Sequence, residues 1–135
     1  MSDMNRTLEL TLPATAEAPS MARNAFWRSL PGEQRPSVRS ADAELLVSEL
    51  VTNSVLHVGP PTGGELISFV LGVDAKRVRV EVSDAGQGIM APISKGGPHD
   101  AESGWGLRLV DQLADDWGVD RSPKGGTTVW FEMRL

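Results

Sequence analysis

The stretch KRVRVEVSDAGQGI, residues Lys76–Ile89, changes character at its midpoint. Its first half alternates valines with charged residues, a period of two that is typical of a β-strand with one face toward the core. Its second half contains Gly86 and Gly88, and glycines allow a backbone to approach a ligand closely and to adopt positive φ. The sequence therefore predicts a strand that ends in a glycine-rich loop, with Asp84 at the junction.

Hydrophobic periodicity and turn residues assign the segments on either side of this stretch. The expected elements are strands over about 7–12, 65–73, 76–83, 117–121 and 127–135, and helices over about 20–30, 37–57 and 106–116. In the first helix, Met21, Ala25 and Leu30 are the candidates for the buried side. The order predicts an α+β fold, a two-layer α/β sandwich with helices on one face of a mixed, mostly antiparallel sheet.

Composition narrows the class of protein. The chain has 135 residues, which predicts a single domain over 1–135, with residues 1–6 expected to be disordered. It has no cysteine, which excludes disulfides, thiolate metal sites and cysteine nucleophiles. A formal charge of −5 argues against direct nucleic-acid binding. No signal peptide or span of about 20 apolar residues is apparent, so we expect a cytoplasmic protein without membrane contact.

Glu49 and Asn53 lie four residues apart in the second predicted helix, so both side chains fall on one face of it. An asparagine oxygen is a suitable ligand for Mg²⁺. A neighbouring glutamate can act as a general base on a hydroxyl group or a water molecule. An exposed polar pair without a function is the alternative that this spacing alone leaves open.

Asp84 stands at the end of an alternating strand, where its carboxylate can accept a hydrogen bond from an exocyclic amino group. Adenine offers such a donor at N6, whereas guanine offers an acceptor at O6. Asp84 therefore favours adenine over guanine. An ordinary Asp-x-Gly turn is the alternative reading of the same residues.

Two further motifs follow along the chain. Gly104-Trp105-Gly106 opens the third predicted helix, and the free N–H groups at a helix start attract anions such as phosphates. Gly125-Gly126 precedes Thr127 and Thr128 at the start of the last strand. A threonine there can line a pocket, although threonines are also common in strands by propensity.

Together, the four motifs resemble the histidine-kinase-like (GHKL) ATPases in order and interval. The local matches are SELVTNSVLHV, VSDAGQGI, SGWGLRLVDQLAD and GGTTVWFEM. The resemblance covers nearly the whole chain, and the short length is most similar to the anti-sigma-factor serine/threonine kinase branch of bacteria.

The resemblance implies an ATP site with Mg²⁺ as the metal. It assigns Glu49 as the catalytic base, Asn53 as the metal ligand and Asp84 as the adenine-binding residue. The other implied nucleotide-binding residues are Gly86, Gly88, Gly104, Gly106, Leu107 and Thr127, with Thr128 as a second choice for the threonine. Residues 89–103 would form the ATP lid.

The resemblance also implies a protein kinase that transfers phosphate to a serine of a small anti-sigma antagonist. It allows two further partners, a sigma factor and a second copy of the chain in a homodimer. Two positions depart from the family pattern. Leu56 and Trp105 stand where family members often carry a basic residue. An ATP-dependent protein-binding module with little kinase activity is therefore the alternative function.

A dinucleotide site is a third reading, because Gly86-x-Gly88-x-x-Ala91 matches the relaxed form of its fingerprint. That site needs a helix to begin within the motif. Pro92 and Pro98 make such a helix improbable, and the Walker-type phosphate loop is absent from the sequence.

Overall fold

The computed structural model describes residues 6–30, 32, 37–58, 65–84, 104–121 and 126–135. Along the chain it contains β1 (Arg6–Pro13), α1 (Ala18–Ser29), α2 (Val38–Val58), β2 (Leu66–Val73), β3 (Arg77–Asp84), α3 (Gly104–Leu113), β4 (Asp116–Arg121) and β5 (Thr127–Arg134). The predicted order of elements is confirmed. The third helix differs most, because it begins two residues before the predicted start and ends three before the predicted end.

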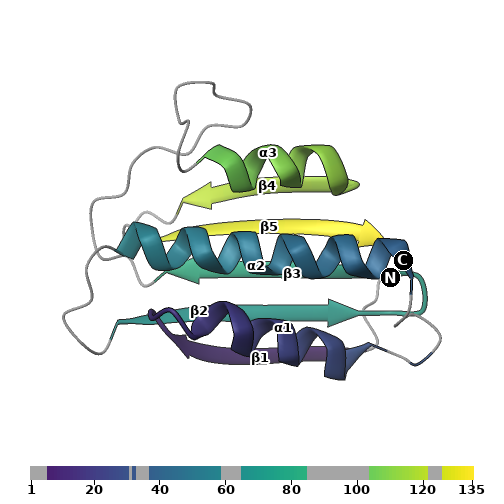
Figure 1. Ribbon diagram of the computed structural model, residues 1–135, viewed down its shortest axis with the longest axis horizontal. Helices are drawn as coiled ribbons and strands as arrows, with labels where there is room; N and C mark the ends of the chain where they lie inside the picture. Colours follow the sequence, from purple (N-terminus) through teal and green to yellow (C-terminus); the bar gives the residue numbers. More distant parts are fainter. Residues whose placement is uncertain (1–5, 31, 33–36, 59–64, 85–103, 122–125) are drawn as a thin grey trace.

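The strands form one sheet in the order β1-β2-β3-β5-β4. Every pair among the described strands is antiparallel, whereas the sequence suggested a mixed sheet. The α+β class is confirmed, and Figure 1 shows the three helices lying together on one face of the sheet. The result is a two-layer fold.

Alternation in the strands creates the core between these layers. In β3, Val78, Val80 and Val82 are buried, while the charged residues between them lie on the opposite face. β5 repeats the pattern from Thr127 to Met133. The two strands therefore offer a continuous apolar surface, which α2 covers.

Two serines cap the N-terminal end of α2. The backbone N–H of Ser40 donates to Ser37 Oγ over 3.0 Å, and the backbone N–H of Ser37 donates to Ser40 Oγ over 3.1 Å. This reciprocal pairing satisfies N–H groups that have no partner within the helix. Its buried residues, from Ala43 to Ser54, recur every three or four positions and face the sheet.

α1 corrects one prediction. Ala25 and Leu30 are buried as expected, but Met21 is 43% exposed and is not part of the buried side. The helix buries Ala18, Ala22, Ala25 and Phe26 instead. The long side chain of Met21 suggested a core residue, whereas the small alanines allow α1 to pack closely on its neighbours.

The face of the sheet opposite the helices carries a polar cluster around Trp130. The guanidinium of Arg79 lies 4.2 Å from the centre of the Trp130 ring. Gly118 lies directly against this ring, because a Cβ built there would stand 2.8 Å from Trp130 Nε1. Trp117 is in the core and Trp27 packs against it, whereas Trp130 belongs to this outer cluster.

Two sequence predictions concern the N-terminal residues and the absence of a membrane-spanning helix. Residues 1–5, predicted to be disordered, lie outside the described residues, and Arg6 already belongs to β1. Within the described part of the chain, every helix is too short or too polar to cross a membrane.

Candidate functional site

The predicted site residues that the structure describes belong to elements that meet at one end of the sheet, with Glu49 nearer the middle of α2. Figure 1 shows that α2 ends, β3 ends, β5 begins and α3 begins at the same side of the molecule, on the left of the view. This arrangement follows from the antiparallel sheet, which brings the last residues of β3 beside the first residues of β5. Residues from four distant parts of the sequence therefore share one location.

Glu49 and Asn53 come from the C-terminal half of α2. Both side chains are half-buried, next to the fully buried Leu50 and Val51. Within the described part of the chain, neither side chain has a hydrogen-bond partner. Neither residue has a side-chain polar atom that is both buried and without a partner, so these groups are open to solvent and accessible to a ligand.

Asp84 and Thr127 lie on the core face at the same end of neighbouring strands. Asp84 is 9% exposed and Thr127 is 6% exposed. The register pairs Ser83 with Thr128, so the next residue of β3 and the preceding residue of β5 are neighbours across the two strands. The structure therefore brings these two predicted residues together.

Thr128 points to the other face of the sheet. Its hydroxyl group lies 2.7 Å from Ser83 Oγ, in a hydrogen bond that either oxygen could donate. The structure thus separates the two threonines that the sequence left as alternatives, since only Thr127 faces the layer of helices.

The first turn of α3 contains the predicted Gly104 and Gly106. Leu107 is 5% exposed and its side chain belongs to the core, so its backbone is the part that stays available for the predicted contact with a nucleotide. Three predicted features, Gly86, Gly88 and the lid at 89–103, lie outside the described residues. Their roles stay predictions.

The donor set suits Mg²⁺ better than a metal held by protein alone. Across the described ranges, 6–30 to 126–135, no three His, Cys, Asp or Glu side chains gather as a metal cluster. Mg²⁺ is commonly bound through one or two protein oxygens together with waters and substrate phosphates. Asn53, with Glu49 one turn away, fits that pattern.

The opposite end of the sheet contains an arginine clamp that the sequence did not predict. Arg39, in the first turn of α2, donates from Nη2 to both carboxylate oxygens of Asp115, over 3.0 and 2.9 Å. It also donates to the backbone oxygens of Leu113 and Arg134, each over 3.1 Å. Because these partners are 74 to 95 residues away in the sequence, local patterns gave no signal of it.

The side chain of Asp74 holds the turn between β2 and β3 at this same end of the sheet. Asp74 Oδ1 accepts hydrogen bonds from the backbone N–H groups of Lys76 and Arg77, over 2.8 and 2.9 Å. The bond from the Lys76 N–H is the main reason that the pKa of Asp74 lies below its ordinary value of 3.8; burial opposes it as the next-largest influence, and the contacts with Arg77 add to the lowering. These contacts fix the turn between β2 and β3.

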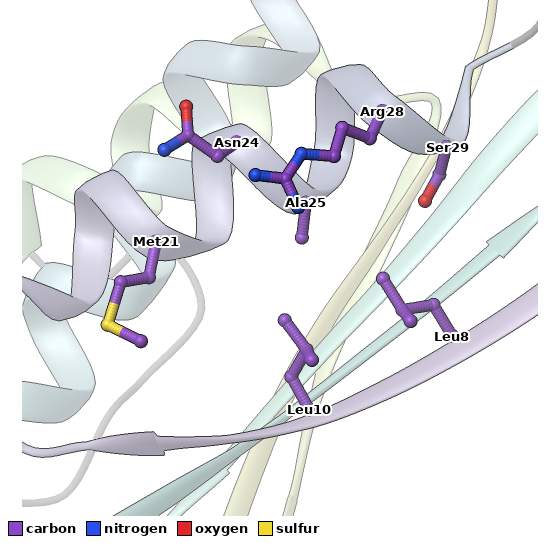
Figure 2. Close-up of a pocket in the computed structure, with 7 residues that line it drawn as sticks. All are labelled: Leu8, Leu10, Met21, Asn24, Ala25, Arg28 and Ser29. Atoms are coloured by element: carbon purple, nitrogen blue, oxygen red, sulfur yellow. The ribbon is translucent and has the colours of Figure 1, made fainter.

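A groove of about 390 Å³ lies away from the candidate site, between α1 and the edge strand β1. Figure 2 shows Leu8 and Leu10 rising from β1 toward α1, with Arg28 extended along the helix above them. None of the predicted site residues lines this groove.

The fold and the convergent polar residues define a protein of the nucleotide-binding α/β sandwich type. A family model described as "Histidine kinase-like ATPase domain" matches residues 12–133. The chain therefore belongs to the histidine kinase-like ATPase family, as its motifs predicted.

Curated relatives agree with the predicted branch. The chain is similar to the anti-sigma F factor of Clostridium acetobutylicum, with 27% identity over 139 residues, 98% of this chain and 96% of the relative. It is also similar to the anti-sigma F factor of a Thermoanaerobacter species, with 26% identity over 129 residues, 90% of this chain and 89% of the relative.

Two solved structures share the fold. One contains the RsbU and RsbW domains of a Mycobacterium tuberculosis protein, with 27% identity and a TM-score of 0.63 over 97% of this chain. This chain spans 33% of that longer one. The other is the SiaB–SiaC complex of Pseudomonas aeruginosa, with 13% identity and a TM-score of 0.62, over 95% of this chain and 89% of that one. At that identity it supports the fold alone.

Proposed function

We propose that this protein is a serine/threonine kinase of the anti-sigma type, which uses Mg-ATP to phosphorylate a small antagonist protein. The observation that carries the proposal is the convergence of Glu49, Asn53, Asp84 and Thr127 at one end of an ATPase-family fold. The similarity to anti-sigma F factors over nearly the whole chain supports the choice of branch.

Each residue has a distinct task in the proposed site. The buried carboxylate of Asp84 accepts a hydrogen bond from the adenine amino group, and Thr127 beside it adds a hydroxyl to the same pocket. The N–H groups in the first turn of α3 face the phosphates. The base and the phosphates are thus held by different elements.

Asn53 would hold Mg²⁺, which when bound neutralises charge on the phosphates. In the transfer step, the serine hydroxyl oxygen of the partner forms a bond to the γ-phosphorus. The bond from that phosphorus to the bridging oxygen breaks, and ADP leaves with the electron pair. The carboxylate of Glu49 accepts the hydroxyl proton.

The test is to incubate the protein with Mg-ATP and candidate antagonist proteins, and to search for phosphoserine by mass spectrometry. Glu49→Gln is expected to slow phosphorylation by about 10²- to 10⁴-fold, the usual contribution of a general base. ATP affinity should stay within about twofold, because the amide keeps the shape of the side chain.

Glu44→Gln is the matched control, since Glu44 is another half-buried glutamate of α2 but lies toward the other end of the helix. It should phosphorylate at the wild-type rate. Equal rates for wild type and Glu49→Gln would remove Glu49 from the mechanism, and an absence of phosphoserine on every candidate would overturn the kinase proposal.

One observation favours a second candidate, an ATP-dependent binding module. Leu56 is 66% exposed on α2, one turn beyond Asn53, at a position where family members often carry a cation. An exposed leucine beside the nucleotide site suits contact with a partner protein. Under this alternative, Glu49→Gln retains ATP-dependent affinity for the partner, and the wild type shows no transfer of phosphate.

A further inference from the structure

The arginine clamp lies far from the candidate site, yet it contacts α3, the helix whose first turn belongs to that site. Arg39 and Asp115 are at one end of the sheet, whereas the first turn of α3 is at the other (Figure 1). The contacts of Arg39 reach the last residue of α3, the residue that links α3 to β4, and the last residue of β5. One side chain therefore joins α2, α3 and the sheet.

The position of Arg39 is unfavourable for its own helix. It stands in the first turn of α2, where the partial positive charge of the helix start disfavours a cation. By contrast, α3 has no basic residue in its last turn, where a cation is favoured. Arg39 supplies that cation from α2, by donating to the carbonyl oxygen of Leu113.

Asp115 completes the clamp. Its carboxylate follows the C-terminal end of α3, where a negative charge is unfavourable without a partner. It accepts two hydrogen bonds from Arg39 and one from the backbone N–H of Arg134, the last over 2.6 Å. Both bonds from Arg39 come from Nη2, while Nε and Nη1 bond the two backbone oxygens, and a lysine with three N–H groups could not bond all four acceptors.

Helical spacing connects the clamp to the site. Arg39, Leu46 and Asn53 are seven residues apart and share one stripe of α2. Figure 1 shows α2 and α3 lying antiparallel, and Arg39 contacts Leu113 at the C-terminal end of α3. Arg39 is therefore at the C-terminal end of α3, and Asn53 lies toward its N-terminal end.

We propose that Arg39 is a positioning residue for the phosphates of ATP, acting through α3. The inference rests on the proposed function, because it assumes that the first turn of α3 meets the phosphates. α3 has 10 residues and is about 15 Å long, so a tilt of about 5° at the clamp moves its first turn by about 1 Å. A misplacement of about 1 Å at a reacting centre can cost about 10²-fold in rate. The same displacement also lengthens the hydrogen bonds from the first turn of α3 to the phosphates and weakens ATP binding.

The test compares ATP with adenosine, because adenosine uses the Asp84 pocket without the phosphate contacts. For Arg39→Ala, the dissociation constant of Mg-ATP is expected to rise about tenfold or more, while that of adenosine stays within about twofold. Arg39→Lys should also weaken ATP, since an ammonium cannot bind both oxygens of Asp115 and the two carbonyls together. Asp115→Asn should have an effect in the same direction.

Arg79→Ala is the matched control. Arg79 also bonds two carboxylates, Glu81 over 3.0 Å and Glu132 over 2.8 Å, but the alternation of β3 places it on the face of the sheet opposite the helices. The Arg79→Ala variant should be less stable to unfolding, but the ratio of its dissociation constants for Mg-ATP and adenosine should equal that of the wild type. That ratio is the readout that a merely structural role would leave unchanged.

The outcomes separate the two proposals. If the wild type binds no ATP, the proposed function fails. If the wild type binds ATP but Arg39→Ala binds it equally well, the inference fails. It also fails if Arg39→Ala loses affinity for ATP and for adenosine to the same extent. Should Arg39→Ala not fold, Arg39→Lys and Asp115→Asn decide the question by the same ratio.

Discussion

The two ends of the sheet use their polar side chains in opposite ways. Where β3 ends and β5 begins, Glu49 and Asn53 are half-buried and have no hydrogen-bond partner among the described residues. At the other end, Arg39 donates from all three guanidinium nitrogens, and Asp74 fixes a hairpin turn. We propose that the first end, where Ser83 and Thr128 are the pair that a hydrogen bond joins on the outer face, binds a ligand, and that the second end mainly holds the fold.

This contrast predicts different phenotypes for the two ends. A change at the ligand end should alter nucleotide affinity with little effect on folding stability. A change at the paired end should alter stability and leave nucleotide affinity unchanged, unless it acts through α3 as Arg39 does.

The largest effect on binding is expected from Asp84→Asn. The amide replaces one acceptor oxygen with a donor and removes the charge, so the side chain of this variant would be a weaker hydrogen-bond acceptor for the adenine amino group than the carboxylate is. Loss of about 1–3 kcal/mol, the cost of an unsatisfied buried group, corresponds to ATP affinity about 5- to 150-fold weaker by calorimetry. An unchanged affinity for ATP would place adenine elsewhere.

A smaller effect separates the two threonines. Thr127→Val keeps the shape of the side chain and removes the hydroxyl group that faces the helices, so ATP affinity should fall about fivefold, equivalent to about 1 kcal/mol. Thr128→Val removes only the bond to Ser83 on the other face, and should bind ATP as the wild type does. The reverse result would mean that the wrong threonine lines the pocket.

The smallest effect on ATP, and the clearest effect on folding, is expected from Asp74→Ala. Loss of the turn contacts should lower the free energy of unfolding by about 1 kcal/mol at pH 7, measured with urea, while ATP affinity stays unchanged. The folded-state pKa of Asp74 lies below the unfolded value of 3.8, so its stabilising effect is complete above that pH. The difference from the wild type should therefore shrink as the pH falls below 3.8 and Asp74 becomes protonated. A constant difference across that range would contradict an ionised Asp74 as its source.

Local patterns predicted the ligand end better than the paired end. Val78, Val80 and Val82 alternate so regularly that the sequence predicted the strand and its buried face, and with them the position of Asp84 at the strand's end. Glu49 and Asn53 share a helix face by spacing alone. The placement of the candidate residues was therefore predictable wherever one element carried the whole signal.

Contacts between distant elements could not be predicted in this way. The pairing of Arg39 with Asp115 depends on the antiparallel placement of α2 and α3, which no local pattern records. Met21 was misassigned because the apolar character of one side chain outweighed the alanine row that α1 buries. The choice between Thr127 and Thr128 needed the register of β3 and β5.

The central claim is that this end of the sheet binds Mg-ATP and recognises its base through Asp84. Calorimetry of the wild type with ATP and with GTP, each with and without Mg²⁺, tests it most directly. We predict tighter binding of ATP in the presence of Mg²⁺, and GTP binding weaker by about 5- to 150-fold. Equal affinity for ATP and GTP, or no binding of either, would contradict the account.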